Sequence, residues 1–123
     1  MSIAHRVRVQ QVDLRSDHFN RVRNTTLDWQ RSDGRWQTVQ RETVDHGDGA
    51  AVLLYDPRRR TVVLLRQFRY ACFINGLDDL LIEVPAGLLD AASPEACIRA
   101  EAEQEVGFRV RQPRRVFDAF MSP

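Results

Sequence analysis

Residues Ile82 to Phe108 read IEVPAGLLDAASPEACIRAEAEQEVGF, and this stretch decides how the fold is organised. It begins with a short apolar strand that a proline stops, and a loop follows. Ser93 is a favoured residue for a helix N-cap, Pro94 suits the first helical position, and Gly107 is typical of a helix end. The sequence therefore predicts a strand, a loop and a capped helix that runs to about Val106.

The predicted helix carries glutamates at helical spacing. Glu101 and Glu105 are four residues apart and Gln104 follows Glu101 by three, so the three side chains share one face. Two like charges at this spacing cost about 0.2–0.5 kcal/mol, a cost that a bound cation would reverse. Mg²⁺ is commonly held by one or two carboxylates together with the phosphates of a substrate. The spacing indicates a magnesium site, and the alternative is a solvated acidic face.

The composition limits the classes of partner. The chain has 123 residues and a net charge of +1, which gives no electrostatic reason to expect a nucleic acid or a membrane surface. No apolar run approaches the roughly 20 residues that a membrane-spanning helix needs. The two cysteines, Cys72 and Cys97, lack metal-ligand spacing and are expected to be buried free thiols in a reducing compartment. We expect a soluble, cytoplasmic, single-domain protein.

Residues 1–47 are predicted to form an N-terminal antiparallel β subdomain. Its expected elements are strands over residues 7–14, 19–30 and 36–44, with a hairpin turn at Asp33-Gly34. Trp29 and Trp36 flank the turn, so we expect them to pair across it. A glycine-rich break then separates this subdomain from residues 48–123.

The second part opens with two continuous apolar runs, Ala50–Tyr55 and Thr61–Leu65. Such runs are typical of strands that are buried on both faces. Arg69 follows the second run closely, at the end of a buried strand where binding residues are common, although a surface arginine is the alternative. A last strand is predicted over Arg115–Phe120.

Several longer strings resemble one family. They are GDGAAVLLY at 47–55, VVLLRQFR at 62–69, AGLLD at 86–90, PEACIRAEA at 94–102 and FDAFMSP at 117–123. Together they resemble the Nudix hydrolases, in particular the branch of nucleoside-diphosphate-sugar pyrophosphatases. The tail of the Nudix box fits residues 100–108. The chain departs from that box in three places: Ala100 replaces an arginine, Gln104 replaces the first of two paired glutamates, and Ser93 stands for a glutamate in a loop that is one residue short.

The resemblance implies an α/β (α+β) fold, namely the Nudix α/β/α sandwich with a mixed sheet, preceded by an N-terminal antiparallel sheet. That N-terminal part implies a homodimer, in which it exchanges with the partner and contributes to the partner's substrate site. Members of the branch continue beyond the MSP segment with more of the sheet, a covering helix and a further glutamate that acts on the attacking water. The resemblance therefore implies that this chain lacks the C-terminal part of the fold.

The resemblance also implies an activity, which is Mg²⁺-dependent hydrolysis of a nucleoside-diphosphate sugar of the GDP-mannose or ADP-ribose type. The products would be a nucleoside monophosphate and a sugar phosphate, with Mn²⁺ as a substitute ion. The implied metal ligands are the Ala86 carbonyl, Glu101 and Glu105, with Gln104 as a weakened position, and the two glutamates are the implied catalytic residues. The implied substrate contacts are Phe19, Gln40, Arg41, Glu42, Arg69, Gly87 and Leu88. The alternative is a non-catalytic nucleotide-sugar-binding or dimerisation module on the same fold.

Overall fold

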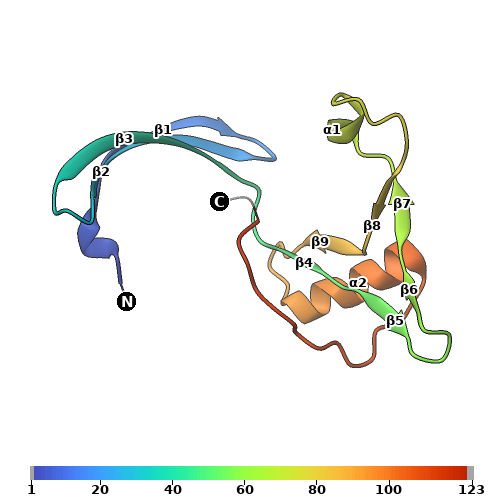
Figure 1. Ribbon diagram of the computed structural model, residues 1–123. Coiled ribbons are helices and arrows are strands. Elements are labelled where there is room, and N and C mark those ends of the chain that lie inside the picture. Colours follow the sequence, from blue (N-terminus) through green and yellow to red (C-terminus); the bar gives the residue numbers. More distant parts are fainter. Residues whose placement is uncertain (1, 122–123) are drawn as a thin grey trace. The chain divides into compact units, whose positions relative to one another are not determined.

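The computed structural model describes residues 2–121, which form an α+β arrangement of two compact units (Figure 1). One unit extends to His46 and the other begins at Gly47. The fold class is therefore α+β with an N-terminal antiparallel sheet, as predicted. Every strand pairing among the described residues is antiparallel, so the mixed sheet that the resemblance implies is not present among them. The last two residues of the closing FDAFMSP string, Ser122 and Pro123, lie outside the described residues.

The elements follow one another in this order: η1 (Ala4–Arg6), β1 (Val7–Asp17), β2 (Arg21–Gln30), β3 (Trp36–Asp45), β4 (Gly49–Ala51), β5 (Leu54–Asp56), β6 (Thr61–Val63), β7 (Leu65–Gln67), α1 (Tyr70–Phe73), β8 (Leu81–Glu83), β9 (Ala86–Leu88) and α2 (Pro94–Val106). The first unit holds η1 and a three-stranded sheet in the order β1-β2-β3. The second holds three two-stranded ladders, β4-β9, β5-β6 and β7-β8, together with both α-helices.

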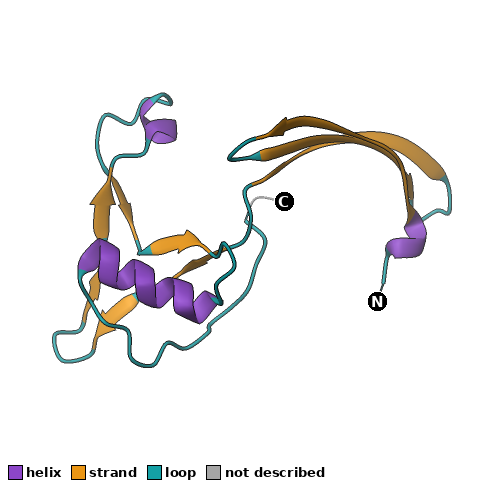
Figure 2. Cartoon of the chain, turned by 180° about the vertical axis from the view of Figure 1, so that it is seen from behind, coloured by secondary structure: helices purple, strands orange, loops and turns teal. Residues whose placement is uncertain are grey.

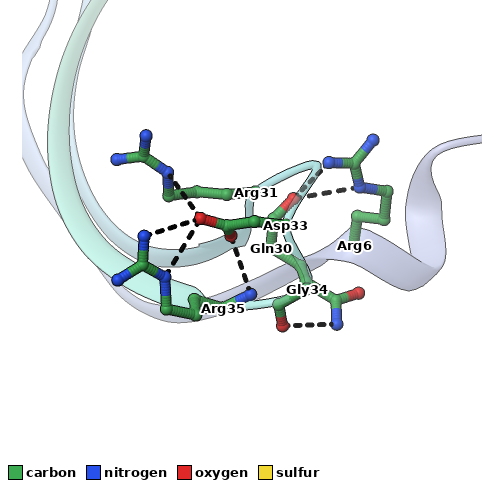
Figure 3. A network of polar contacts seen from close by, with 6 residues as sticks. All are labelled: Arg6, Gln30, Arg31, Asp33, Gly34 and Arg35. Atoms are coloured by element: carbon green, nitrogen blue, oxygen red, sulfur yellow. Dashed lines mark hydrogen bonds and ion pairs between the residues drawn. The ribbon is translucent and has the colours of Figure 1, made fainter.

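The hairpin turn between β2 and β3 is the one predicted from Asp33-Gly34. Gly34 has φ +84°, a left-handed conformation that glycine adopts without steric cost. The Asp33 carboxylate accepts hydrogen bonds from the backbone N–H of Arg35 at 3.1 Å and from its guanidinium at 2.8 Å (Figure 3). Beside this turn, the guanidinium of Arg6 donates to the carbonyl oxygen of Gln30, which ties η1 to the end of β2 (Figure 3).

The register of the first sheet places most of its apolar side chains on one face, called the apolar face here although it also carries Arg23 and Arg41, while Val22, Trp36 and Val44 lie on the other, more polar face. Directly opposed residues share a face and successive residues alternate. The apolar face carries Val7, Val9, Val12, Leu14, Leu27, Trp29 and Val39. Two register shifts in β1, after Val9 and after Leu14, mark bulges, and bulges bend a strand, which agrees with the pronounced curvature of the sheet (Figure 1).

The expected pairing of Trp29 with Trp36 is wrong. Trp29 opposes Gln37 and Trp36 opposes Gln30, so the two rings lie on opposite faces of the sheet. Each ring is covered by an arginine instead. The guanidinium carbon of Arg6 is 4.5 Å from the centroid of Trp29, and that of Arg8 is 3.8 Å from the centroid of Trp36. Both contacts are cation–π interactions that position the aromatic rings.

Helix α2 of the second unit begins and ends as predicted. The Ser93 hydroxyl accepts a hydrogen bond from the Ala96 N–H at 3.2 Å, and Pro94 opens the helix. Gly107 ends it at φ +72°, where the N–H groups of Gly107 and Phe108 bond back to the carbonyl oxygens of Glu103 and Ala102. The helix packs against β4 and β9 (Figure 2).

The interior of the second unit is small. Its buried residues are Cys97 and Ala102 on α2 and Pro85 just before β9. The prediction that 50–55 and 61–65 form strands buried on both faces is wrong, since Tyr55 is 59% exposed and Leu64 is 47% exposed. Burial on both faces requires a layer on each side, and α2 makes its main packing contacts with β4 and β9 rather than with β5 and β6.

The predicted strand over residues 115–120 is also wrong. The structure has no regular element there, and Phe117 and Phe120 are 79% and 93% exposed. The chain after α2 runs as a loop, shown in red in Figure 1. Residues with high β-propensity form a strand only when a neighbouring strand provides hydrogen-bond partners. No described strand pairs with this segment. Within residues 2–121 no helix combines the length and apolar character needed to cross a bilayer.

Candidate active site

The backbone of β9 forms the floor of the site. Val52 donates to the carbonyl oxygen of Pro85, and hydrogen-bonded pairs alternate with non-hydrogen-bonded ones along an antiparallel ladder. The next pair, Ala51 and Ala86, is therefore a non-hydrogen-bonded one. As a result, the N–H and the carbonyl of Ala86 both point away from β4, and the carbonyl oxygen of Ala86 is left available as a ligand.

Glu105 lies against this free edge. Its Oε2 atom accepts a hydrogen bond from the Ala86 N–H at 3.3 Å, and its Oε1 atom accepts one from the Gln67 side-chain amide at 2.6 Å. The side chain is half-buried. Both carboxylate oxygens of Glu105 are thus fixed by neutral donors, one from β9 and one from β7.

Glu101, one turn earlier on α2, lies against the next residue of β9. A Cβ atom built on Gly87 would stand 2.2 Å from Oε1 of Glu101. Real Cβ atoms never come that close, so the carboxylate occupies the space that a side chain at this position would fill. Glu101 is also half-buried. The two glutamates of the predicted metal site therefore approach consecutive residues of the same strand.

Cys97 lies one turn before Glu101 on the same face of α2, and it contacts β9. Its thiol donates weakly to the carbonyl oxygens of Gly87 and Leu88, at 3.5 Å each. Burial raises the pKa of the Cys97 thiol, and the negative charge of Glu101 raises that pKa further. The thiol therefore stays protonated. Cys72 is half-buried and also free, so one of the two expected buried thiols is only partly buried.

This arrangement fits a hard divalent cation. The donor set consists of two carboxylates and a backbone carbonyl, all of them oxygen ligands of the kind that Mg²⁺ prefers. Among residues 2–121 there is no cluster of three or more histidine, cysteine, aspartate or glutamate side chains with metal-binding geometry. Two carboxylates leave several positions for water and for phosphate oxygens, which is how Mg²⁺ is usually bound in phosphate-transfer sites.

Arg69, which the sequence also singles out, lies in the same unit at the N-terminal end of α1. Its Nε atom donates to Oε2 of Glu83 at 2.9 Å, and Glu83 ends the strand that precedes β9. Arg69 keeps 45% of its side chain exposed, whereas Glu83 keeps 24%. A guanidinium held at its Nε atom still has four other N–H groups, so Arg69 can bind a phosphate while paired.

The remaining residues of the predicted site are exposed or lie elsewhere in the sequence order of elements. Gln104 is exposed on α2 next to Glu105, and Glu103, which is not a predicted site residue, is also exposed and pairs with Arg109 at 3.3 Å. Leu88 is half-buried in β9. Phe19 belongs to the first unit, in the loop between β1 and β2, and is 78% exposed.

The predicted segment Gln40-Arg41-Glu42 lies in β3 of the first unit. Its side chains alternate, so Arg41 is on the apolar face while Gln40 and Glu42 are on the polar one. Arg41 borders a shallow hollow of about 380 Å³ on the apolar face. The hollow is lined by Leu27, Trp29, Gln37, Val39 and Arg41. The three residues therefore cannot bind one ligand from a single face of this sheet.

Sequence reasoning missed Gln67. The residue is the last of β7, and its partner Glu105 is 38 positions away in sequence. The sequence gives one indication, which is that an uncharged polar residue, Gln67, stands between Arg66 and Phe68 in the string RQFR. This indication does not predict which face of the strand the Gln67 side chain occupies, nor that α2 lies next to it.

Comparison with known proteins supports the resemblance. Residues 6–43 match the family model described as "GDP-mannose pyrophosphatase NudK N-terminal domain". The chain is 48% identical over 109 residues to the GDP-mannose pyrophosphatase of Salmonella arizonae, which covers 88% of this chain and 57% of the relative. It is 50% identical over 109 residues to that of Klebsiella pneumoniae, covering 88% of this chain and 55% of the relative. The chain thus spans little more than half the length of the curated relatives it matches, and its resemblance to the nucleoside-diphosphate-sugar pyrophosphatases is confirmed.

Proposed function

We propose that this protein, which resembles the GDP-mannose pyrophosphatases over most of its length, acts in Mg²⁺-dependent hydrolysis of a nucleoside-diphosphate sugar. The observation that carries the proposal is the approach of Glu101 and Glu105 to the backbone of residues 86–87. GDP-mannose is the preferred substrate in this proposal because the relatives bear that name, and ADP-ribose is the comparison substrate. The products are a nucleoside monophosphate and a sugar phosphate.

In this proposal Glu101, Glu105 and the Ala86 carbonyl hold the ion, and Mn²⁺ can replace Mg²⁺. An ion held by these residues would supply charge neutralisation at the phosphates and would lower the pKa of a water molecule. Gly87 contributes by having no side chain, which admits the Glu101 carboxylate to the strand. Arg69 binds a phosphate oxygen with the N–H groups that its pairing with Glu83 leaves free.

The first unit supplies the second part of the proposal. Its apolar face packs against a second copy of the chain, which makes the protein a homodimer. The support is that Val9, Val12 and Leu14 of β1 are 60%, 53% and 56% exposed on a single face. In such a dimer Phe19 and the segment 40–42 contribute to the partner's substrate site, with Arg41 acting from the apolar face.

A second candidate function is a nucleotide-sugar-binding or dimerisation module without turnover. Two departures from the Nudix box favour it, namely Ala100 and Gln104. Both side chains are exposed on α2. Gln104 provides an oxygen ligand without the charge of a glutamate, so binding of additional Mg²⁺ ions is weaker than in a site with paired glutamates.

One assay separates the two functions. The protein is incubated with GDP-mannose or ADP-ribose in the presence of Mg²⁺, Mn²⁺ or EDTA, and release of the mononucleotide is followed by chromatography. Release that EDTA abolishes supports the enzyme, and binding of the nucleotide sugar without release supports the module. Glu105→Gln should abolish release, while Glu103→Gln, its exposed neighbour on α2, should leave it unchanged. Full turnover by Glu105→Gln would refute the assignment of the metal site.

A further inference from the structure

Gln67 makes the closest contact to the Glu105 carboxylate. Its Nε2 atom lies 2.6 Å from Oε1 of Glu105, while the Ala86 N–H lies 3.3 Å from Oε2. An ionised carboxylate offers about four lone-pair positions on its two oxygens. Each oxygen of Glu105 therefore accepts one hydrogen bond and keeps a position free for a cation. The side chain cannot rotate without breaking at least one of these bonds.

The position of Gln67 is itself fixed by the sheet. Gln67 opposes Leu81 in the β7-β8 ladder, and it is half-buried. Arg66, the residue before it, pairs with Asp79 at 2.7 Å in an exposed ion pair. Side chains alternate along a strand, so the register that directs Arg66 outward directs Gln67 toward α2. The Gln67–Glu105 hydrogen bond therefore connects a strand of one ladder to the helix that packs on another.

The amide group suits this role because it is a donor without charge. An arginine or lysine in its place would neutralise Glu105 and compete with a bound cation. A glutamate would offer no donor and would repel Glu105. Partners that orient a metal ligand without touching the metal commonly change metal affinity or activity by about 10- to 100-fold when they are removed.

We propose that Gln67 is a positioning residue that orients Glu105 toward a divalent cation. The inference rests on the proposed function, since it takes Glu105 as a metal ligand. It adds a residue from β7 to a site otherwise built from α2 and β9. It also gives the glutamine of the RQFR string a role distinct from that of its neighbour Arg69, which is paired with Glu83.

The test measures Mn²⁺ binding by electron paramagnetic resonance, in the protein without substrate. Gln67→Met keeps the length of the side chain and removes the donor, so Mn²⁺ affinity should fall about 10-fold or more. Arg66→Met is the matched control, because it makes the same replacement one position earlier on the outward side of β7. Its affinity should equal that of the unsubstituted protein. Equal affinity in Gln67→Met and Arg66→Met would overturn the inference.

Water-proton relaxation of the Mn²⁺ complex distinguishes positioning from direct ligation. A residue that acts only through Glu105 leaves the number of bound waters unchanged when Gln67→Met is added to Glu105→Gln, whereas loss of a direct ligand adds a water. An added water in that double variant, relative to Glu105→Gln alone, would therefore overturn the inference. If Gln67→Met does not fold, Gln67→Asn retains the amide but is one methylene too short to reach Glu105, and the same fall in affinity is expected.

The outcomes separate this inference from the proposed function. EDTA-sensitive hydrolysis by the unsubstituted protein, together with unchanged Mn²⁺ affinity in Gln67→Met, refutes the role of Gln67 alone. Absence of Mn²⁺ binding by the unsubstituted protein refutes both. A fall in affinity that is confined to the Gln67 variants supports the inference even if no nucleotide sugar is hydrolysed.

Discussion

The Glu101 carboxylate occupies the space directly above Gly87, where an added Cβ would meet Oε1 at 2.2 Å and Cγ at 2.8 Å. The glycine is required here by a neighbouring side chain. This differs from Gly34 and Gly107, which adopt positive φ angles of 84° and 72°. The close approach brings the Glu101 carboxylate to β9, next to Ala86, whose carbonyl is the third proposed metal ligand.

Gly87→Ala should therefore displace Glu101 and weaken Mn²⁺ binding by about 10- to 100-fold, the range seen when the support of a metal ligand is lost. Mn²⁺ affinity by electron paramagnetic resonance is the measurement. Gly76→Ala is the control, because Gly76 has φ +95° with no atom near its Cβ position. That variant should lose about 1 kcal/mol of stability from backbone strain alone and should bind Mn²⁺ normally. Unchanged affinity in Gly87→Ala would contradict the placement of Glu101.

Arg69→Ala should raise the KM for GDP-mannose about 10- to 100-fold, because hydrogen bonds to charged groups contribute about 1.5–3 kcal/mol. Arg66→Ala is the control, since Arg66 forms a comparable ion pair with Asp79 at the surface. Steady-state kinetics distinguish the two variants. An equal KM in both would mean that Arg69 serves only to hold Glu83.

The sequence predicts well what depends on near neighbours. The caps of α2 are specified by Ser93 and Gly107, and the turn after β2 is specified by Asp33 and Gly34, each through contacts within a few residues. The spacing of Glu101 and Glu105 likewise places both carboxylates on one helix face. These features follow from local backbone geometry, so they do not depend on how the rest of the chain packs.

The features that sequence reasoning missed depend on distant partners. The Gln67–Glu105 hydrogen bond requires β7 and α2 to meet, and local sequence does not specify that contact. The separation of Trp29 from Trp36 depends on which residues oppose each other across the hairpin. The exposure of Tyr55 and Leu64 depends on which layer covers a strand, and an apolar run indicates only that burial is favourable.

Val12→Asp should convert the proposed homodimer into monomers, because it places a charge among the exposed apolar side chains of β1 on the apolar face of the first sheet. Val12 is 53% exposed in the single chain and opposes Thr25 of β2. Gln11→Asp is the matched control, one position earlier on the opposite, polar face. Light scattering coupled to size-exclusion chromatography gives the mass of each variant. A dimer that survives Val12→Asp would show that the copies associate through another surface.

Asp33→Asn should destabilise the first sheet in a pH-dependent way. The hydrogen bond from the Arg35 side chain, followed by that from its backbone N–H, holds the pKa of Asp33 below its ordinary value of 3.8. A carboxyl with a lowered folded-state pKa binds fewer protons when folded, so its contribution is complete above pH 3.8 and is lost as the pH falls through the folded-state value.

The free energy of unfolding in urea should therefore be lower for Asp33→Asn than for the unsubstituted protein at pH 7. The difference should shrink as the pH is lowered below 3.8, where Asp33 becomes protonated and can no longer attract Arg35. Arg35→Gln removes the guanidinium, which is the largest of these contributions, but keeps the backbone hydrogen bond, so adding Asp33→Asn to it should produce a smaller change at pH 7 than Asp33→Asn alone. A difference that persists at low pH would show that the asparagine disturbs the geometry of the turn, and that the charge of Asp33 is not what stabilises it.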